Sequence, residues 1–112
     1  MNPFDYGCLD QTVTIYRQKN GEILRTVVEN CYFVPKLLQK TTMTGKSGLK
    51  KFLLIIPGEM DLRPGDRVCE GLGPEQVDWH TFLPDLLSGV FEIDYVKPCF
   101  WEGQVCHIRA GQ

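Results

Sequence analysis

The chain has 112 residues, of which 43% are hydrophobic and 23% charged, and its formal net charge is −2. This length and balance fit one globular domain and exclude a strongly basic protein whose whole surface attracts polyanions. The charge is unevenly distributed, because residues 1–52 hold eight Lys/Arg and four Asp/Glu, whereas residues 53–112 hold four Lys/Arg and ten Asp/Glu. A basic first half and an acidic second half suit head-to-tail self-association or docking between unlike partners. Charges that are scattered by chance and only keep the surface solvated give the same pattern.

The five cysteines and the N-terminal sequence bear on the compartment. The count is odd, and the segment MNPFDYGCLD is polar and lacks the apolar stretch of a signal peptide. We therefore expect reduced thiols in the cytoplasm. No run approaches the roughly 20 apolar residues that a membrane span needs, so we expect no membrane partner.

The first half of the chain predicts three strands. Residues 1–10 are expected to be a flexible N-terminal arm. Residues 12–16 alternate with β-branched and aromatic side chains, and Asn20-Gly21 supplies the positive φ angles of a hairpin turn. Residues 23–35 form the second strand, bent near Glu29-Asn30. Residues 36–49 are polar and basic, which indicates a long mobile hairpin tip or loop, and the third strand follows at 49–56.

In the second half, turns alternate with short strands. Pro57-Gly58 ends the third strand, and the sequence LRPGDRV at residues 62–68 makes a tight turn into a strand at 67–70. A short helical turn is expected near residues 81–88. Residues 90–96 alternate strictly, and a closing strand at 104–109 follows a break at Pro98. The whole chain, 1–112, is therefore predicted to be mainly β, a small single-domain β-barrel or sandwich of five to six antiparallel strands.

The sequence holds no convincing catalytic or ligand motif. Cys99, Cys106 and His107 are close in sequence, but adjacent residues of a strand point to opposite faces, which argues against a shared metal. Gly71-x-Gly73 lacks the lysine and the following long helix of a phosphate-binding loop. Glu92 and Asp94 share one face of a strand, as the solvated face of an edge strand would. We expect no enzyme activity, no cofactor and no metal.

Two groups of residues are candidates for interaction. The first is the basic loop, an interface or DNA-facing surface whose residues are Lys36, Lys40, Lys46, Lys50 and Lys51. A small barrel with such a loop could follow a phosphate backbone, so a small nucleic-acid-binding barrel using residues 36–51 is the alternative function. The second is Phe100-Trp101, which could be an exposed interface anchor.

Taken in order, the pattern resembles a family of small uncharacterised prophage proteins of Gram-positive bacteria, encoded in the head–tail joining and minor capsid region. The resemblance covers nearly the whole chain. Its most specific part is the strand ending Ile55-Ile56-Pro57 followed by Leu62-Arg63-Pro64-Gly65-Asp66-Arg67-Val68, and the spacer between Ile56 and Leu62 is shorter than in longer relatives.

The resemblance implies a structural part of the virion. The expected role is a head–tail connector, either a head-closure (stopper) or an adaptor subunit, that assembles into a homo-oligomeric ring between portal and tail. It further implies other phage structural proteins as partners and at most non-specific contact with phage DNA. The protein would lie in the bacterial cytoplasm during assembly and at the head–tail interface of the virion.

Overall fold

The computed structural model describes the backbone of residues 9–42, 45–83 and 89–112, and the side chains of the same ranges except 36–50. The expected N-terminal arm lies almost wholly outside these residues. The described chain is mainly β and contains no helix long and apolar enough to cross a membrane.

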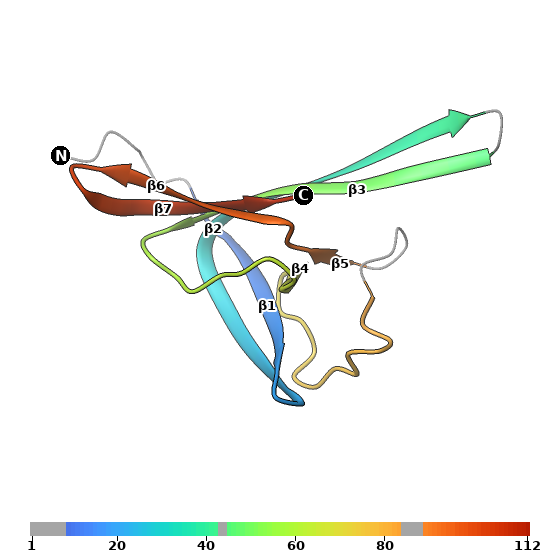
Figure 1. Ribbon diagram of the computed structural model, residues 1–112, viewed down its shortest axis with the longest axis horizontal. Coiled ribbons are helices and arrows are strands. Elements are labelled where there is room, and N and C mark those ends of the chain that lie inside the picture. The colour runs from blue at the N-terminus through green and yellow to red at the C-terminus, as the bar shows by residue number, and fades with distance from the viewer. Residues whose placement is uncertain (1–8, 43–44, 84–88) are drawn as a thin grey trace.

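Seven antiparallel strands form one strongly curled sheet that resembles half a barrel (Figure 1). The strands follow the order β5-β4-β1-β2-β3-β7-β6 across the sheet. In chain order they are β1 (Gln11–Lys19), β2 (Glu22–Thr42), β3 (Gly45–Pro57), β4 (Arg67–Glu70), β5 (Val90–Glu92), β6 (Tyr95–Trp101) and β7 (Gln104–Gly111).

Strand β2 bends where it changes partners. Residues up to Cys31 pair with β1, and those from Tyr32 onward pair with β3. At the change Asn30 has a φ of 57°, and the register with β1 shifts by a β-bulge. The Gln11 side-chain amide then exchanges two hydrogen bonds of 2.8 and 2.9 Å with the backbone of Phe33. These observations confirm the predicted bend near Glu29-Asn30.

The two strands at the edges of the sheet follow one another in the chain. Strands β5 and β6 lie at opposite edges, and only Ile93 and Asp94 separate them. Ile93 exchanges hydrogen bonds with Gly65 and Asp66, beside β4, whereas the N–H of Asp94 donates to the carbonyl of Gly111 at the end of β7. The adjacent residues Ile93 and Asp94 are thus hydrogen-bonded to opposite ends of the sheet, and this link holds the sheet in its curl.

A single apolar core fills the inside of the curl. Its centre is a triangle of rings, Phe33 from β2, Phe52 from β3 and Phe91 from β5, with centroids 5.4 to 5.7 Å apart. Around it pack the other core side chains, which follow the period-two alternation of the strands. They include Val13, Ile15, Cys31, Leu54, Ile56, Leu62, Val68, Ile93, Ile108 and Ala110.

The outer face of β1 is also buried, because residues 71–83 fold over it. The Thr14 hydroxyl donates to the carbonyl of Gly71, and the Tyr16 hydroxyl donates to the carbonyl of Pro74 at 2.6 Å. A β-carbon at Gly73 would lie within 3 Å of both the Tyr16 hydroxyl and the Cys69 sulfur. Glycine at this position is therefore what lets the covering segment approach the sheet.

Three differences from the sequence predictions have physical causes. The described residues form seven strands rather than five to six, because the run 90–96 is divided at Ile93-Asp94 and β6 continues through Pro98. Proline is tolerated there because β6 is an edge strand. The helical turn expected near 81–88 falls largely on residues 84–88, outside the described residues, and residues 81–83 are not helical. At residues 36–49, where a hairpin tip or loop is expected, the described backbone forms the paired strands of a hairpin at 36–42 and 45–49, so the regular pairing extends further than predicted.

Gly73 tests the packing of the covering segment. We expect Gly73→Ala to lower the free energy of unfolding by about 1–3 kcal/mol, because the added methyl group overpacks the contact with Tyr16 and Cys69. Gly89→Ala is the control, since its β-carbon would meet nothing within 4 Å. Urea unfolding of both variants measures the difference, and equal stabilities would contradict this account.

Candidate functional site

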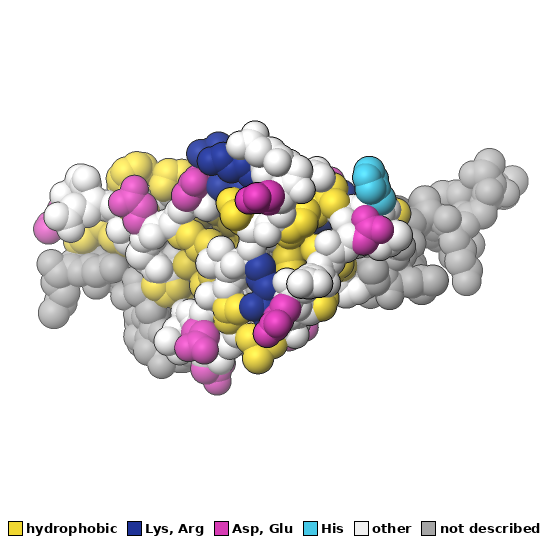
Figure 2. Space-filling view, turned by 90° about the horizontal axis from the view of Figure 1, so that it is seen from below, with side chains coloured by type: hydrophobic (Ala, Val, Ile, Leu, Met, Phe, Trp, Pro, Cys, Tyr) yellow, Lys and Arg dark blue, Asp and Glu magenta, His cyan; other side chains and the backbone are white. Residues whose placement is uncertain are grey.

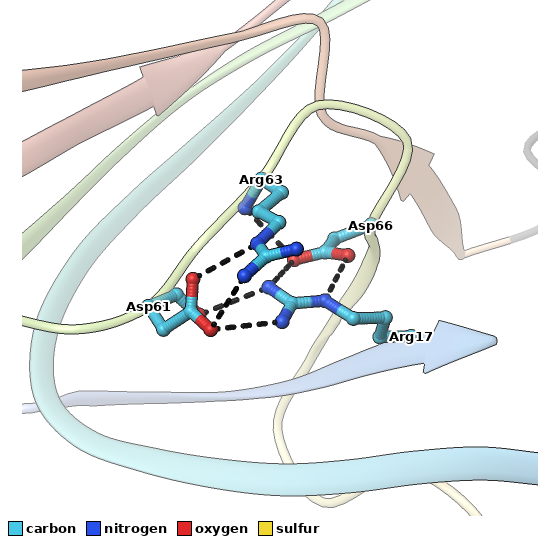
Figure 3. A network of polar contacts seen from close by, with 4 residues as sticks. All are labelled: Arg17, Asp61, Arg63 and Asp66. Carbon is cyan, nitrogen blue, oxygen red and sulfur yellow. Dashed lines mark hydrogen bonds and ion pairs between the residues drawn. The ribbon is translucent and has the colours of Figure 1, made fainter. Parts of the chain in front are cut away.

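Four charged residues form a polar network where the tight turn after Leu62 meets β1 (Figure 3). The turn is Arg63-Pro64-Gly65-Asp66, with a φ of 95° at Gly65 and a hydrogen bond from the N–H of Asp66 to the carbonyl of Arg63, as in a type II turn. Arg17, from β1, donates to both carboxylate oxygens of Asp66 at 2.8 and 2.7 Å. The turn predicted from the sequence is thus confirmed, and its aspartate is joined to a distant strand.

The Arg17–Asp66 pair is held by several further contacts within the chain. The Asp66 side chain is only 4% exposed and also accepts the backbone N–H of Arg63. Two further N–H groups of Arg17 donate to the carboxylate and the carbonyl of Asp61 at 3.1 and 3.0 Å. The adjacent carboxylates raise the pKa of Arg17, with Asp66 contributing most, and Arg63 and Arg17 lower the pKa of Asp61. Four of the five N–H groups of Arg17 are thus bonded within the chain, so the pair serves mainly to hold the fold together.

Hollows lie on both sides of the network. The smaller, of about 60 Å³, is lined by Arg17, Asp66 and apolar residues that include Leu24 and Met60. The larger, of about 350 Å³, lies between the end of β1 and the turn. It is lined by Arg17, Gln18, Lys19, Arg63, Pro64, Gly65, Asp66 and Trp79. Lys19 and Arg63 are both exposed at this hollow, beside the ring of Trp79. Arg63 also forms an exposed ion pair with Asp61 at 3.1 Å, whereas Lys19 is in none of the ion pairs found among the described residues.

Other arginines of the sheet hold the covering segment and are not available to a partner. Arg25 donates to the carbonyls of Gly73 and Pro74. Arg67 donates to the carbonyls of Trp79 and Phe82, and its guanidinium lies 3.8 Å from the centre of the Trp79 ring. The guanidinium groups of Arg25 and Arg67 thus bind the backbone and the Trp79 ring of the covering segment.

The exposed charge of the described side chains is mainly acidic. On the face seen in Figure 2, acidic side chains are scattered widely and basic ones occur in a few isolated places. The exposed acidic residues are Asp10, Glu22, Glu29, Glu59, Asp61, Glu70, Glu75, Asp78, Asp94 and Glu102; the exposed basic ones are Lys19, Lys51, Arg63, Lys97 and Arg109. A broad phosphate-binding surface is therefore not formed by this part of the chain.

The basic residues predicted as an interface lie on a projecting ribbon, here called the arm (residues 36–42 of β2 and 45–51 of β3). The arm extends away from the rest of the sheet (Figure 1). Lys51 is exposed, while the side chains of Lys36, Lys40, Lys46 and Lys50 lie outside the described ones. In the described backbone the arm pairs only with itself, because β1 pairs with β2 up to Cys31 and β7 pairs with β3 from Leu53.

The second predicted site is at the tip of the β6–β7 hairpin. Phe100 is 60% exposed and Trp101 is 41% exposed, beside a register shift between Cys99 and Phe100. The turn residues Glu102 and Gly103 have φ angles of 52° and 78°. The structure thus places both aromatic residues on the surface, and whether they bind a partner stays a prediction.

The Cys/His group converges only in part, because cross-strand partners share a face of the sheet whereas consecutive residues point to opposite faces. Cys99 is opposite His107 in the β6–β7 register, and Cys106 is the neighbour of His107. Among the described residues, no group of three His, Cys, Asp or Glu side chains could hold a metal ion. Burial, together with the charge of Arg109, lowers the pKa of His107.

Sequence reasoning missed the Arg17–Asp66 pair. The available signal was Arg17 itself, which continues the core-facing positions Val13 and Ile15 of β1 at a spacing of two residues. A charge at such a position requires a partner. Which carboxylate pairs with it depends on long-range contacts that the spacing does not contain.

Comparison with known proteins finds no matching family model, no matching curated protein and no matching solved structure. The function is therefore inferred from the surfaces described above together with the sequence pattern.

Breaking the buried pair tests its structural role. We expect Asp66→Asn to lower the free energy of unfolding by about 2–4 kcal/mol, since it removes the buried carboxylate that pairs with the largely buried Arg17 and leaves only the exposed Asp61 as a counter-charge. Asp61→Asn is the matched control and should change stability little, because that carboxylate is exposed. Chemical denaturation of the three proteins provides the measurement. Equal losses for both variants would show that burial of Asp66 does not matter.

His107 should make stability depend on pH. Because its pKa in the folded protein lies below the unfolded value of about 6.5, the unfolded chain binds more protons at acid pH. The free energy of unfolding therefore falls as the pH drops through that value towards the lowered pKa. We expect His107→Gln to flatten this fall in thermal melts, whereas the exposed control His80→Gln should keep it. An unchanged slope in His107→Gln would contradict the assignment.

Proposed function

We propose that this protein is a structural subunit of a phage virion, a head-closure or adaptor subunit that assembles into a ring between the portal and the tail. The proposal begins from the order of strands and turns that resembles the prophage family, with its Pro-Gly-Asp turn. No reaction is proposed, since the buried ion pair found among the described residues is engaged by its own neighbours.

The observation that carries the proposal is the arm. A two-stranded ribbon alone in water is marginally stable, and its outer edges present unpaired backbone N–H and C=O groups. Such a ribbon gains stability when another chain adds to an edge, as in β-strand addition. Assembly therefore gives the arm a role that an isolated monomer does not.

The rest of the molecule suits the same role. The curled sheet, with its aromatic core and buried ion pair, is a rigid body from which hairpins project (Figure 1). A subunit of this kind is expected to be a monomer at low concentration and to order its projecting segments when neighbours dock. Contact with DNA passing through the ring would be non-specific and salt-sensitive, because the exposed charge outside the arm is mainly acidic.

Co-expression with the portal protein of the same prophage tests the proposal. We expect electron microscopy of the purified portal complex to show an added ring of density at the tail-facing end. Replacing residues 38–49 by Asn-Gly joins Leu37 to Lys50 through a two-residue turn, shortening the arm without touching the core. We expect this variant to remain folded and to lose the added density.

A full-length control carries Gln39→Ser and Thr41→Ser within the arm and should retain the ring. Absence of added density with the unmodified protein would overturn the proposed function. Retention of a normal ring by the shortened variant would instead show that the arm is not the assembly element.

A further inference from the structure

The tip of the β6–β7 hairpin combines apolar and acidic groups in a way that folding does not require. Phe100 and Trp101 remain largely exposed, at 60% and 41%. The next residue, Glu102, has a φ of 52°, a conformation that asparagine or glycine adopts more readily in a two-residue hairpin turn. Glutamate here puts a carboxylate on the turn beside two aromatic rings. Backbone strain of this kind is often found at functional surfaces.

The larger hollow beside the polar network has complementary chemistry. The side chains of Lys19 and Arg63 are exposed in its wall, and neither contacts the Asp66 carboxylate. Arg63 is paired only with the exposed carboxylate of Asp61, a contact that solvent weakens. Pro64, Gly65 and the half-buried ring of Trp79 provide apolar surface between them. A volume of about 350 Å³ is at the lower end of the range for sites that take up a bound group. An aromatic side chain followed by a carboxylate fits this lining.

We propose that the hollow receives the β6–β7 hairpin tip of a second copy of this chain, with Trp101 against the apolar surface and Glu102 beside Lys19 and Arg63. The inference rests on the proposed assembly role and names the contact between neighbouring subunits. Charge complementarity favours a second copy as the occupant, since one chain carries both the acidic aromatic tip and the basic hollow.

The two surfaces cannot meet within one molecule, because the β6–β7 hairpin and the β1–β2 hairpin point in different directions (Figure 1). A contact between two different patches of identical chains is heterologous, and such contacts generate closed rings or open filaments rather than two-fold dimers. The contact is expected to be weak in solution. A portal that holds several copies close together would strengthen it through their high local concentration.

Charge reversal provides the test, because the two halves of the contact can be altered in separate chains. We expect Glu102→Arg alone, and the double variant Lys19→Glu with Arg63→Glu alone, each to weaken self-association at least tenfold in sedimentation experiments over a concentration series. An equimolar mixture of the two should associate like the unmodified protein, because every tip then meets a hollow of opposite charge. Glu75→Arg, a change at another exposed acidic residue, is the control and should leave association unchanged.

The aromatic part of the contact is tested by Trp101→Ala, which should weaken association about thirtyfold if Trp101 is a central anchor. Thermal melts establish that each variant is folded. Failure of the mixture to restore association, or absence of self-association by the unmodified protein both alone and on the portal, would overturn the inference.

The same variants, applied to the portal complex, separate this inference from the proposed function. A normal ring formed by each charge-reversed protein on its own would reject the tip-to-hollow contact and leave the connector role standing. Restored association of the mixture in solution, without any ring on the portal, would support the contact and reject the connector role.

Discussion

The bidentate ion pair between Arg17 and Asp66 is the interaction on which the rest of the structure depends. It ties the type II turn before β4 to β1, two segments 49 residues apart in the chain. The backbone of the same turn, at Gly65 and Asp66, exchanges hydrogen bonds with Ile93, from which the chain passes to the opposite edge of the sheet. The pair therefore positions the point that holds the sheet in its curl, and the curl encloses the core.

This arrangement separates a rigid body from projecting surfaces. Residues that pack inside the curl or hold the covering segment, such as Phe33 and Arg67, have their contacts within the chain. The arm, the β6–β7 tip and the basic hollow are at the periphery, where backbone edges, aromatic rings and charges remain accessible. Binding surfaces are commonly displayed this way, because a rigid scaffold limits the ordering cost of association.

The sequence was informative for elements that local rules specify. The alternation at residues 12–16, the Asn20-Gly21 turn and the Pro64-Gly65 turn all appear as predicted, because side-chain period and positive φ are properties of a few neighbouring residues. The exposed tip at Phe100-Trp101 was also anticipated as a candidate. At residues 36–49 a hairpin tip or loop was expected, but the length of the strand pairing was not, since the polar composition resembles a loop and only pairing across the hairpin makes these residues strands. Likewise, the hollow exists only because the end of β1 lies beside the turn at Pro64.

The sequence by itself determined the strand-and-turn order, a mainly β fold with one core, and the residues that could not be buried without a partner. Tertiary structure decided which partners they found: Asp66 for Arg17, Gly65 and Asp66 for Ile93, and Gly73 for the ring of Tyr16. The physical reason is range. Backbone angles and alternation are fixed within a few residues, whereas a buried charge or a sheet edge is satisfied by groups that only the curl of the whole chain brings within hydrogen-bond distance.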